Sequence, residues 1–80
     1  MSADEVVTQA AQLITSGDFA GAMAVFEGYI DSKPDDPAGY HGWAEAALFD
    51  IQENGNLDDK GNDRINEGQI NAYFRRAASM

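Results

Sequence analysis

Apolar residues recur every three or four positions along the chain, which is the spacing of one face of an α-helix. They do not alternate with polar residues as they would in a half-buried strand. The pattern therefore predicts an all-α fold with four helices, and we expect the aromatic residues Phe26, Tyr40, Trp43 and Phe74 to lie in its core. The apolar positions of the four segments are Val6, Val7, Ala10, Leu13 and Ile14; Phe19, Ala22, Met23, Phe26, Tyr29 and Ile30; Tyr40, Trp43, Ala44, Ala47, Leu48 and Ile51; and Ile70, Tyr73, Phe74 and Ala77.

Residues that favour helix ends bound each of these segments. A side-chain oxygen at the N-cap accepts a hydrogen bond from a free amide of the first turn, and a Glu or Gln three residues later completes a capping box. Glycine, or a residue before proline, favours the end of a helix. Ile65 and Ile70 have the spacing of a hydrophobic staple around the last start. The predicted starts are Ser2 with Glu5, Asp18, Asp36 before Pro37, and Asn66 with Gln69; the predicted ends are Gly17, Lys33-Pro34 and Asn54-Gly55.

The connections predict how the helices pair. Short connections separate the first three helices, and short loops make neighbouring helices antiparallel. We therefore expect two antiparallel helical hairpins in one domain, residues 1–80. The segment 52–64 is rich in Asn, Asp and Gly, and it predicts a long, solvated loop within the second hairpin.

Five glycines fall inside the predicted helices. Each costs about 1 kcal/mol relative to alanine at an exposed helix position. We expect modest stability, and close approach of two helices at some of these sites. The five are Gly21, Gly28, Gly39, Gly42 and Gly68.

One segment resembles a known repeat. Gly17-Asp18-Phe19, followed by Ala22, Phe26 and Pro34, resembles the second half of a tetratricopeptide (TPR) repeat, with its Gly-Asp-aromatic turn, small residue, aromatic residue and closing proline. Counting back, Ala10 and Leu13 fall at the small and aromatic positions of the first helix. Tyr40 and Ala44 fall at the corresponding tryptophan and small positions of a second repeat, and 70–77 resembles its second helix.

The resemblance implies a right-handed TPR-like solenoid fragment of two repeats. Repeat one covers about 3–36 and repeat two about 37–80. Phe26 and Phe74 occupy matching positions 48 residues apart, whereas the repeat period is about 34. The second repeat therefore carries an insertion, at about 52–64, between its helices. The chain departs from the family pattern at Gln9, Tyr29 and Ile70.

In this family, ligands usually lie in the groove lined by the first helix of each repeat. Members that clamp a carboxylate terminus use Lys, Arg and Asn there, and this chain has none of them at those positions. The resemblance therefore implies an apolar groove with a His-Glu pair, suited to an extended or helical segment with apolar anchors, with or without a basic residue. Alternatively, Leu48 and Phe49 cover the core or a self-association surface. The candidate protein-binding residues are Val7, Ala11, Ile14, His41, Glu45, Leu48 and Phe49.

Charge and cysteine content narrow the classes of partner. Fourteen acidic and five basic residues give a net charge of −9, which repels nucleic acids and anionic membranes and steers basic partners toward the chain. The same charge would also serve solubility alone. The absence of cysteine excludes disulfides and favours a reducing, cytoplasmic setting. The acidic start, Met1–Glu5, argues against a signal peptide, and no apolar run approaches the roughly 20 residues that span a bilayer.

Candidate chemistry is sparse. His41 is the only histidine, and Glu45 lies four residues later on the same helix face. There is no cysteine and no serine in a recognisable nucleophile elbow, so no nucleophile, base and orienting group can be assembled. We expect an ordinary exposed intrahelical pair, no enzymatic activity and no cofactor.

The segment 58–69 resembles a calcium-binding EF-hand loop. Asp58, Asn62 and Ile65 match its pattern, but Lys60 replaces a carboxylate, Asp63 the turn glycine and Gln69 the bidentate glutamate. A second frame, starting at Asp50, is also broken, since it ends at Gly61. The favoured interpretation is a polar loop of turn-forming residues. The alternative is a degenerate cation site, with Asp58, Asn62 and Asp63 as candidate ligands.

The sequence thus favours a protein–protein interaction module: a scaffold, an adaptor or a chaperone-like holder of a partner segment. One alternative is a calcium-binding helical protein that uses the loop at 58–69. The other is a structural fragment of a longer repeat array.

We predict weak self-association or a homodimer. A hairpin of this kind buries its apolar face by stacking on a neighbour, and two repeats are fewer than the three or so that independent stability usually needs. Either the chain belongs to a longer array, or its last helix packs on another copy. Sedimentation at micromolar concentration tests the second possibility, and a clean monomer with a sharp thermal transition would contradict it.

Overall fold

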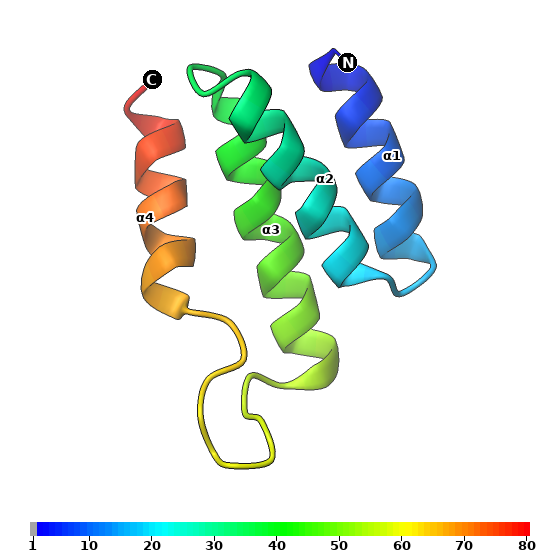
Figure 1. Ribbon diagram of the computed structural model, residues 1–80, viewed down its shortest axis with the longest axis vertical. Coiled ribbons are helices and arrows are strands. Elements are labelled where there is room, and N and C mark those ends of the chain that lie inside the picture. The colour runs from blue at the N-terminus through cyan, green and yellow to red at the C-terminus, as the bar shows by residue number, and fades with distance from the viewer. Residues whose placement is uncertain (1) are drawn as a thin grey trace.

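The computed structural model describes residues 2–80, so Met1 of the acidic start lies outside the described residues. Four helices, α1 (Ala3–Thr15), α2 (Phe19–Ser32), α3 (Pro37–Asn54) and α4 (Glu67–Ala78), follow one another along the chain. Successive helices run in opposite directions (Figure 1). Residues 2–80 form no strand; two loop residues, Leu57 and Asp63, make one isolated bridge.

The prediction of an all-α fold with two antiparallel hairpins is confirmed. The hairpins are α1 with α2 and α3 with α4 (Figure 1). The right-handed solenoid geometry that the TPR resemblance implies stays a prediction, because contacts between adjacent helices do not by themselves define a superhelix.

All four predicted N-caps are present. The carboxylates of Asp18 and Asp36 accept hydrogen bonds of 2.9 Å from backbone amides of the following turn. Ser2 Oγ and Asn66 Oδ1 accept the corresponding bonds at 3.3 and 3.2 Å. Each cap satisfies an amide that has no partner inside its helix, which is why the helices begin where the sequence predicts.

Glycines with positive φ end α1 and α3. Gly17 has φ +85°, and its amide donates to the carbonyl of Ile14 while the amide of Asp18 donates to that of Leu13. This pair of bonds is the Schellman motif, which turns the chain sharply into α2. Gly55, with φ +75°, ends α3.

The four helices are staggered. The molecule measures 37 × 28 × 16 Å, so its shortest dimension exceeds the width of one helix with its side chains, about 10–12 Å. α2 packs against α1 and α3, and α3 packs against α4, whereas α1 and α3 meet over a small area (Figure 1). α1 is therefore in contact with both α2 and α3.

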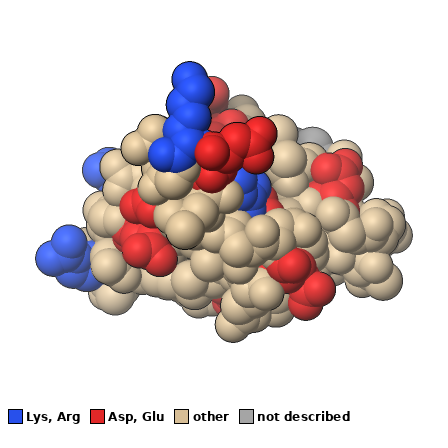
Figure 2. Space-filling view, turned by 90° about the horizontal axis from the view of Figure 1, so that it is seen from below, with Lys and Arg blue, Asp and Glu red and all other residues tan. Residues whose placement is uncertain are grey.

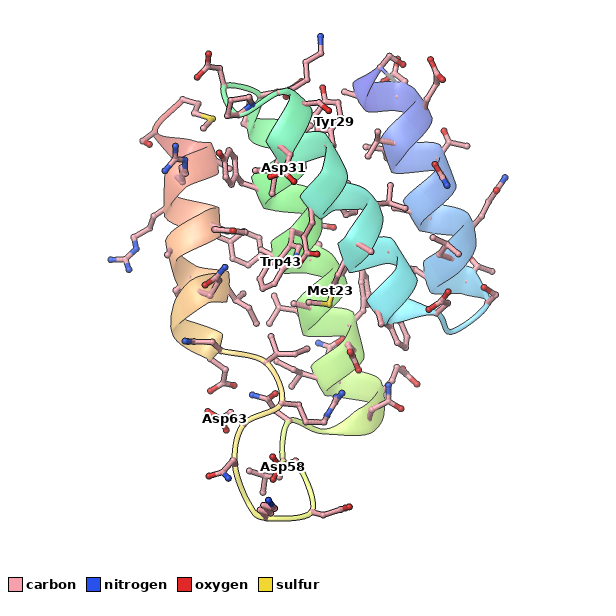
Figure 3. The ribbon with its side chains drawn as sticks, viewed as in Figure 1. Met23, Tyr29, Asp31, Trp43, Asp58 and Asp63 are labelled. Atoms are coloured by element: carbon pink, nitrogen blue, oxygen red, sulfur yellow. The ribbon has the colours of Figure 1, made fainter. Side chains whose placement is uncertain are left out.

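Trp43 joins three of the helices. Its indole Nε1 donates to Glu27 Oε1 on α2 at 3.1 Å, and its ring meets the Tyr73 ring of α4 edge-on at 4.9 Å. Tyr40 also meets Tyr73 edge-on, at 5.2 Å, and the Arg76 guanidinium lies 4.9 Å from the Tyr40 ring centre. Figure 3 shows Trp43 near the middle of the molecule. Edge-to-face aromatic pairs and a cation over a ring are both attractive, so α4 docks on α3 largely through aromatic contacts.

The predicted loop of the second hairpin is displaced by a few residues. It was expected at 52–64, but α3 continues to Asn54 and α4 begins at Glu67, so the connection covers 55–66. The repeat insertion that the TPR resemblance implies at about 52–64 stays a prediction. Ile51 is half-buried against the core, which holds the last turn of α3 in helical form until Gly55 ends it. Among the aromatic residues expected in the core, Phe74 is only half-buried.

α2 and α3 approach each other most closely at two glycines. A methyl group added at Gly42 would lie 2.1 Å from Cε1 of Phe26, and one added at Gly39 would lie 2.8 Å from Cγ1 of Ile30. Gly39 and Gly42 are three residues apart and share the face of α3 that meets α2. These glycines let the Phe26 ring, which is 4% exposed, lie directly against the α3 backbone.

Replacing Gly42 with alanine should therefore destabilise the protein, although alanine favours helices. The new methyl group would collide with a buried ring, and we expect a net loss of about 1 kcal/mol or more in the free energy of unfolding. Gly28→Ala is the matched control, because nothing lies within 4 Å of the added methyl group, and it should stabilise by about 0.5–1 kcal/mol. Urea denaturation followed by circular dichroism measures both changes. Equal stabilisation by the two substitutions would contradict the close approach.

Candidate functional site

An apolar groove lies between α1 and α3, with Phe26 of α2 contributing to its floor. Its volume is about 400 Å³. Six of the seven residues expected to bind a partner line it together, three from each of the two helices: Val7, Ala11, Ile14, His41, Glu45 and Phe49.

Helix periodicity explains this convergence. Val7, Ala11 and Ile14 are spaced by four and three residues, so they form one stripe along α1. The neighbouring Val6 and Ala10 are almost fully buried and belong to the core, and Ala10 also borders the groove. On α3, positions four apart supply the facing wall. The groove is thus the seam where the outer stripes of two helices face each other without closing.

The groove keeps large apolar side chains in contact with water. Val7 is 48% exposed and Phe49 is 42% exposed. Ala11, between Val7 and Ile14, is small and leaves space on the α1 wall. A surface that is both hollow and apolar is typical of a binding site, whereas a scattered exposed Leu needs no explanation.

Leu48 lies outside the lining of the groove. It is 40% exposed, but it precedes Phe49 by one residue and so points about 100° away around α3. Its proposed part in binding stays a prediction that the groove geometry does not support.

Sequence analysis missed five lining residues. Gly42 and Ala38 lie on the same face of α3 as His41 and Glu45, so helical spacing could have identified them. Phe26 had been assigned to the core, and no sequence signal shows that its ring also borders a groove. The five are Ala10, Thr15, Phe26, Ala38 and Gly42.

His41 and Glu45 form the predicted intrahelical pair. His41 Nδ1 lies 3.0 Å from Glu45 Oε1, and the two side chains are 56% and 48% exposed. On its other side, the His41 ring meets the Phe74 ring of α4 at 5.6 Å. An exposed pair of this kind contributes a few tenths of a kcal/mol, so its main effect is to set a polar edge on an apolar groove.

The groove continues beyond Phe49 toward the end of α3. Ile14, Thr15 and Phe49 also border a second hollow, which reaches Glu53 on α3 and Gly17 in the turn after α1. The combined surface therefore has two carboxylates, Glu45 and Glu53, on either side of Phe49. Acidic side chains elsewhere lie in several separate places, as Figure 2 shows for the face seen from the loop end.

The candidate cation ligands lie in a loop closed by its own hydrogen bonds. Asp58 Oδ1 accepts bonds from the amides of Lys60 and Asn62 at 2.8 and 2.9 Å, and the Asp58 amide donates to the Asn62 carbonyl at 2.8 Å. Figure 3 shows Asp58 and Asp63 in this loop, away from the helices. Within residues 2–80, no three His, Cys, Asp or Glu side chains are close enough to hold a metal ion. The calcium alternative gains no support from this geometry.

Asn56 joins the two ends of the loop through hydrogen bonds. Its side-chain oxygen accepts from the Ile65 amide at 2.8 Å, and its side-chain nitrogen donates to the Ile65 carbonyl at 3.0 Å. The Asn56 carbonyl also accepts from the Arg64 amide at 2.8 Å. Ile65 is buried in the core, so these bonds tie the loop to the helices. The loop is solvated, as predicted, but it is a small hydrogen-bonded hairpin.

A partly buried ion pair, which sequence analysis missed, fixes this loop to α3. Asp50 is 7% exposed, and its Oδ1 accepts bonds of 2.9 Å from Arg64 Nη2 and Asn54 Nδ2. Arg64 Nε also donates to the Gly55 carbonyl at 3.1 Å. Asp50 lies three residues after the buried Ala47, and an acid at a core-facing position is the signal that could have revealed the pair.

The pKa of Asp50 reflects competing effects. Burial raises it, but the hydrogen bonds from Arg64 and Asn54, together with the charge of Arg64, bring the pKa below its ordinary value of 3.8.

A second polar contact joins α2 to α3, where the Tyr29 hydroxyl donates to the Asp36 carboxylate. This bond raises the pKa of Tyr29 and lowers that of Asp36.

Comparisons with protein-family models, with curated protein sequences and with solved structures gave no match. The TPR resemblance therefore rests only on the residues given above. In the described part of the chain, residues 2–80, no helix combines the length and apolar content that crossing a membrane requires.

Arg64→Ala should destabilise the protein by about 2 kcal/mol at neutral pH, because it leaves the buried Asp50 carboxylate with one hydrogen-bond donor fewer. Arg75→Ala is the control: Arg75 is exposed and forms no ion pair among residues 2–80.

The effect of Arg64→Ala should depend on pH. The pKa of Asp50 is lowered by folding, so the contribution of Asp50 to the free energy of unfolding is present above pH 3.8 and disappears as the pH falls through the folded-state pKa. The difference between Arg64→Ala and the native protein should therefore shrink below about pH 3.8. Urea unfolding across pH measures it, and a difference that grows on acidification would contradict this account.

Proposed function

We propose that this protein is a protein–protein interaction module, which binds a segment of its partner in the apolar groove between α1 and α3. The observation that carries the proposal is the exposure of Val7 and Phe49, each nearly half accessible beside a hollow of about 400 Å³. The acidic, cysteine-free composition favours a cytoplasmic setting for this interaction.

Burial of these side chains gives the groove its binding energy. Full burial of a large apolar side chain contributes about 1.5–3 kcal/mol. Since Val7 and Phe49 are about half exposed, covering each would add about 1 kcal/mol. Among residues 2–80, no helix covers these two side chains. A partner segment would thus supply the missing neighbour of both helices.

The polar groups of the groove suit binding better than catalysis. The Thr15 hydroxyl donates to the Ala11 carbonyl of its own helix at 2.9 Å, and His41 is paired with Glu45. Neither arrangement provides a nucleophile with a base and an orienting group. No comparable observation among residues 2–80 favours the calcium-binding or array-fragment alternative.

Phe49→Ala should weaken binding of groove ligands about tenfold or more, as expected for loss of a central aromatic anchor. Suitable ligands are peptides selected from a random displayed library, with affinities measured by fluorescence polarisation. Leu57→Ala is the control, because Leu57 is a large apolar residue, 67% exposed, in the loop after α3, and it lines neither the groove nor its extension. It should leave the affinity unchanged.

Two results would contradict the proposed function. One is selection of no peptide that binds the folded protein. The other is equal loss of affinity in Phe49→Ala and Leu57→Ala, which would place the contact outside the groove. Thermal unfolding of both variants checks that each remains folded.

A further inference from the structure

The charges around the groove have a regular arrangement. Glu45, Phe49 and Glu53 are four residues apart and so share one stripe of α3. Eight residues of helix rise about 12 Å, which is the axial distance between the two carboxylates. The α1 wall has no charged side chain at its lining positions, Val7, Ala11 and Ile14. Apart from His41, the ionisable groups lining the groove and its extension are these two acids.

From this arrangement we propose that the groove binds an amphipathic helix whose apolar face carries two basic residues about two turns apart. The inference rests on the proposed function and specifies its partner. Basic residues seven or eight positions apart share a helix face and are separated by about 10–12 Å, which matches the spacing of Glu45 and Glu53. The apolar residues between them would cover Phe49.

A helix suits the groove better than an extended segment. An extended backbone exposes amides and carbonyls that need partners when they leave water. The walls of this groove are helices, whose backbone groups are bonded internally. In the part of the groove between Val7 and Phe49, the Thr15 hydroxyl bonds its own helix and His41 is paired with Glu45. A helical ligand satisfies its own backbone and needs only side-chain contacts.

A second copy of this chain fits the groove poorly. Each copy carries a net charge of −9, so two copies repel each other. The two arginines on α4, Arg75 and Arg76, are adjacent, so they point about 100° apart and cannot face Glu45 and Glu53 together. Arg76 also lies over the Tyr40 ring of its own chain. Any self-association through the last helix would therefore leave the groove to a basic partner.

Three synthetic peptides test the inference. The lysine peptide is an amphipathic helix with leucines on one face and two lysines about seven residues apart beside them. The glutamate peptide replaces both lysines with glutamate. The proline peptide has the composition of the lysine peptide plus a central proline, which breaks the helix. Isothermal titration gives affinities, and amide chemical shifts of the protein locate each binding site.

The lysine peptide should shift the amides of Val7, Ala11 and Phe49, and should bind more tightly than the other two peptides. The variant Glu45→Gln/Glu53→Gln should lose about three- to tenfold in affinity for it, as expected for two exposed ion pairs. Asp31→Asn/Asp35→Asn is the matched control. It changes the net charge equally, at exposed carboxylates that line neither part of the groove. Figure 3 shows Asp31 on α2. The control should bind as the native protein does.

The outcomes separate the inference from the proposed function. Binding of the lysine and glutamate peptides in the groove with equal affinity would overturn the basic partner but leave the interaction module intact. Equal losses of affinity in Glu45→Gln/Glu53→Gln and Asp31→Asn/Asp35→Asn would also overturn the basic partner, because the overall charge and not these two carboxylates would then determine affinity. The interaction module would again remain intact. Groove binding of the proline peptide as tight as that of the lysine peptide would overturn the helical ligand. Shifts confined to residues outside the groove, or no binding by any peptide, would overturn this partner, whereas the proposed function fails only if the display selection also fails.

Discussion

Phe26 lies where the side chains of two facing helices would normally meet. On α3 it finds Gly42 rather than a side chain, so its ring can lie against the backbone of that helix. Gly39 does the same for Ile30 one turn earlier. This close approach sets the spacing of α2 and α3, and the positions of α1 and α4 depend on it, because α1 packs on α2 and α4 packs on α3. α1 also touches α3, and Phe26 of α2 borders the groove that α1 and α3 leave between them.

The second hairpin depends on different forces. Trp43 bonds to Glu27 and stacks edge-on against Tyr73, so it links the central pair of helices to α4. The chain between α3 and α4 is long, and its ends are held by polar contacts, with Asp50 and Arg64 on one side and the Asn56 amide on the other. Because these groups are partly buried, leaving them unpaired would be costly, and the loop adopts one arrangement.

The groove is a consequence of how α1, α2 and α3 pack. α1 contacts α2 and, over a small area, α3, so the outer stripes of α1 and α3 face each other without closing. Leu48, Leu57 and Met80 are also exposed but lie elsewhere, whereas Val7 and Phe49 border this groove. Its acidic edge on α3 then selects among possible partners by charge, which affects specificity more than affinity.

Local signals in the sequence determined the secondary structure. Apolar spacing identified all four helices, and Asp18, Asp36, Gly17 and Gly55 marked ends that the structure reproduces, because caps act between residues a few positions apart. Spacing also placed Val7, Ala11 and Ile14 on one stripe, and His41, Glu45 and Phe49, which the family resemblance placed with it, line the same hollow.

Only the tertiary structure decided which contacts are made between residues distant in the chain. It excluded Leu48 from the groove, brought Phe26 into it and joined Asp50 to Arg64 across 14 residues. These outcomes depend on how α2 and α3 approach each other and on where the loop folds back. Helix periodicity fixes the direction of a side chain around its own axis, but the distance to the next helix is set by packing, and here glycine makes that distance short.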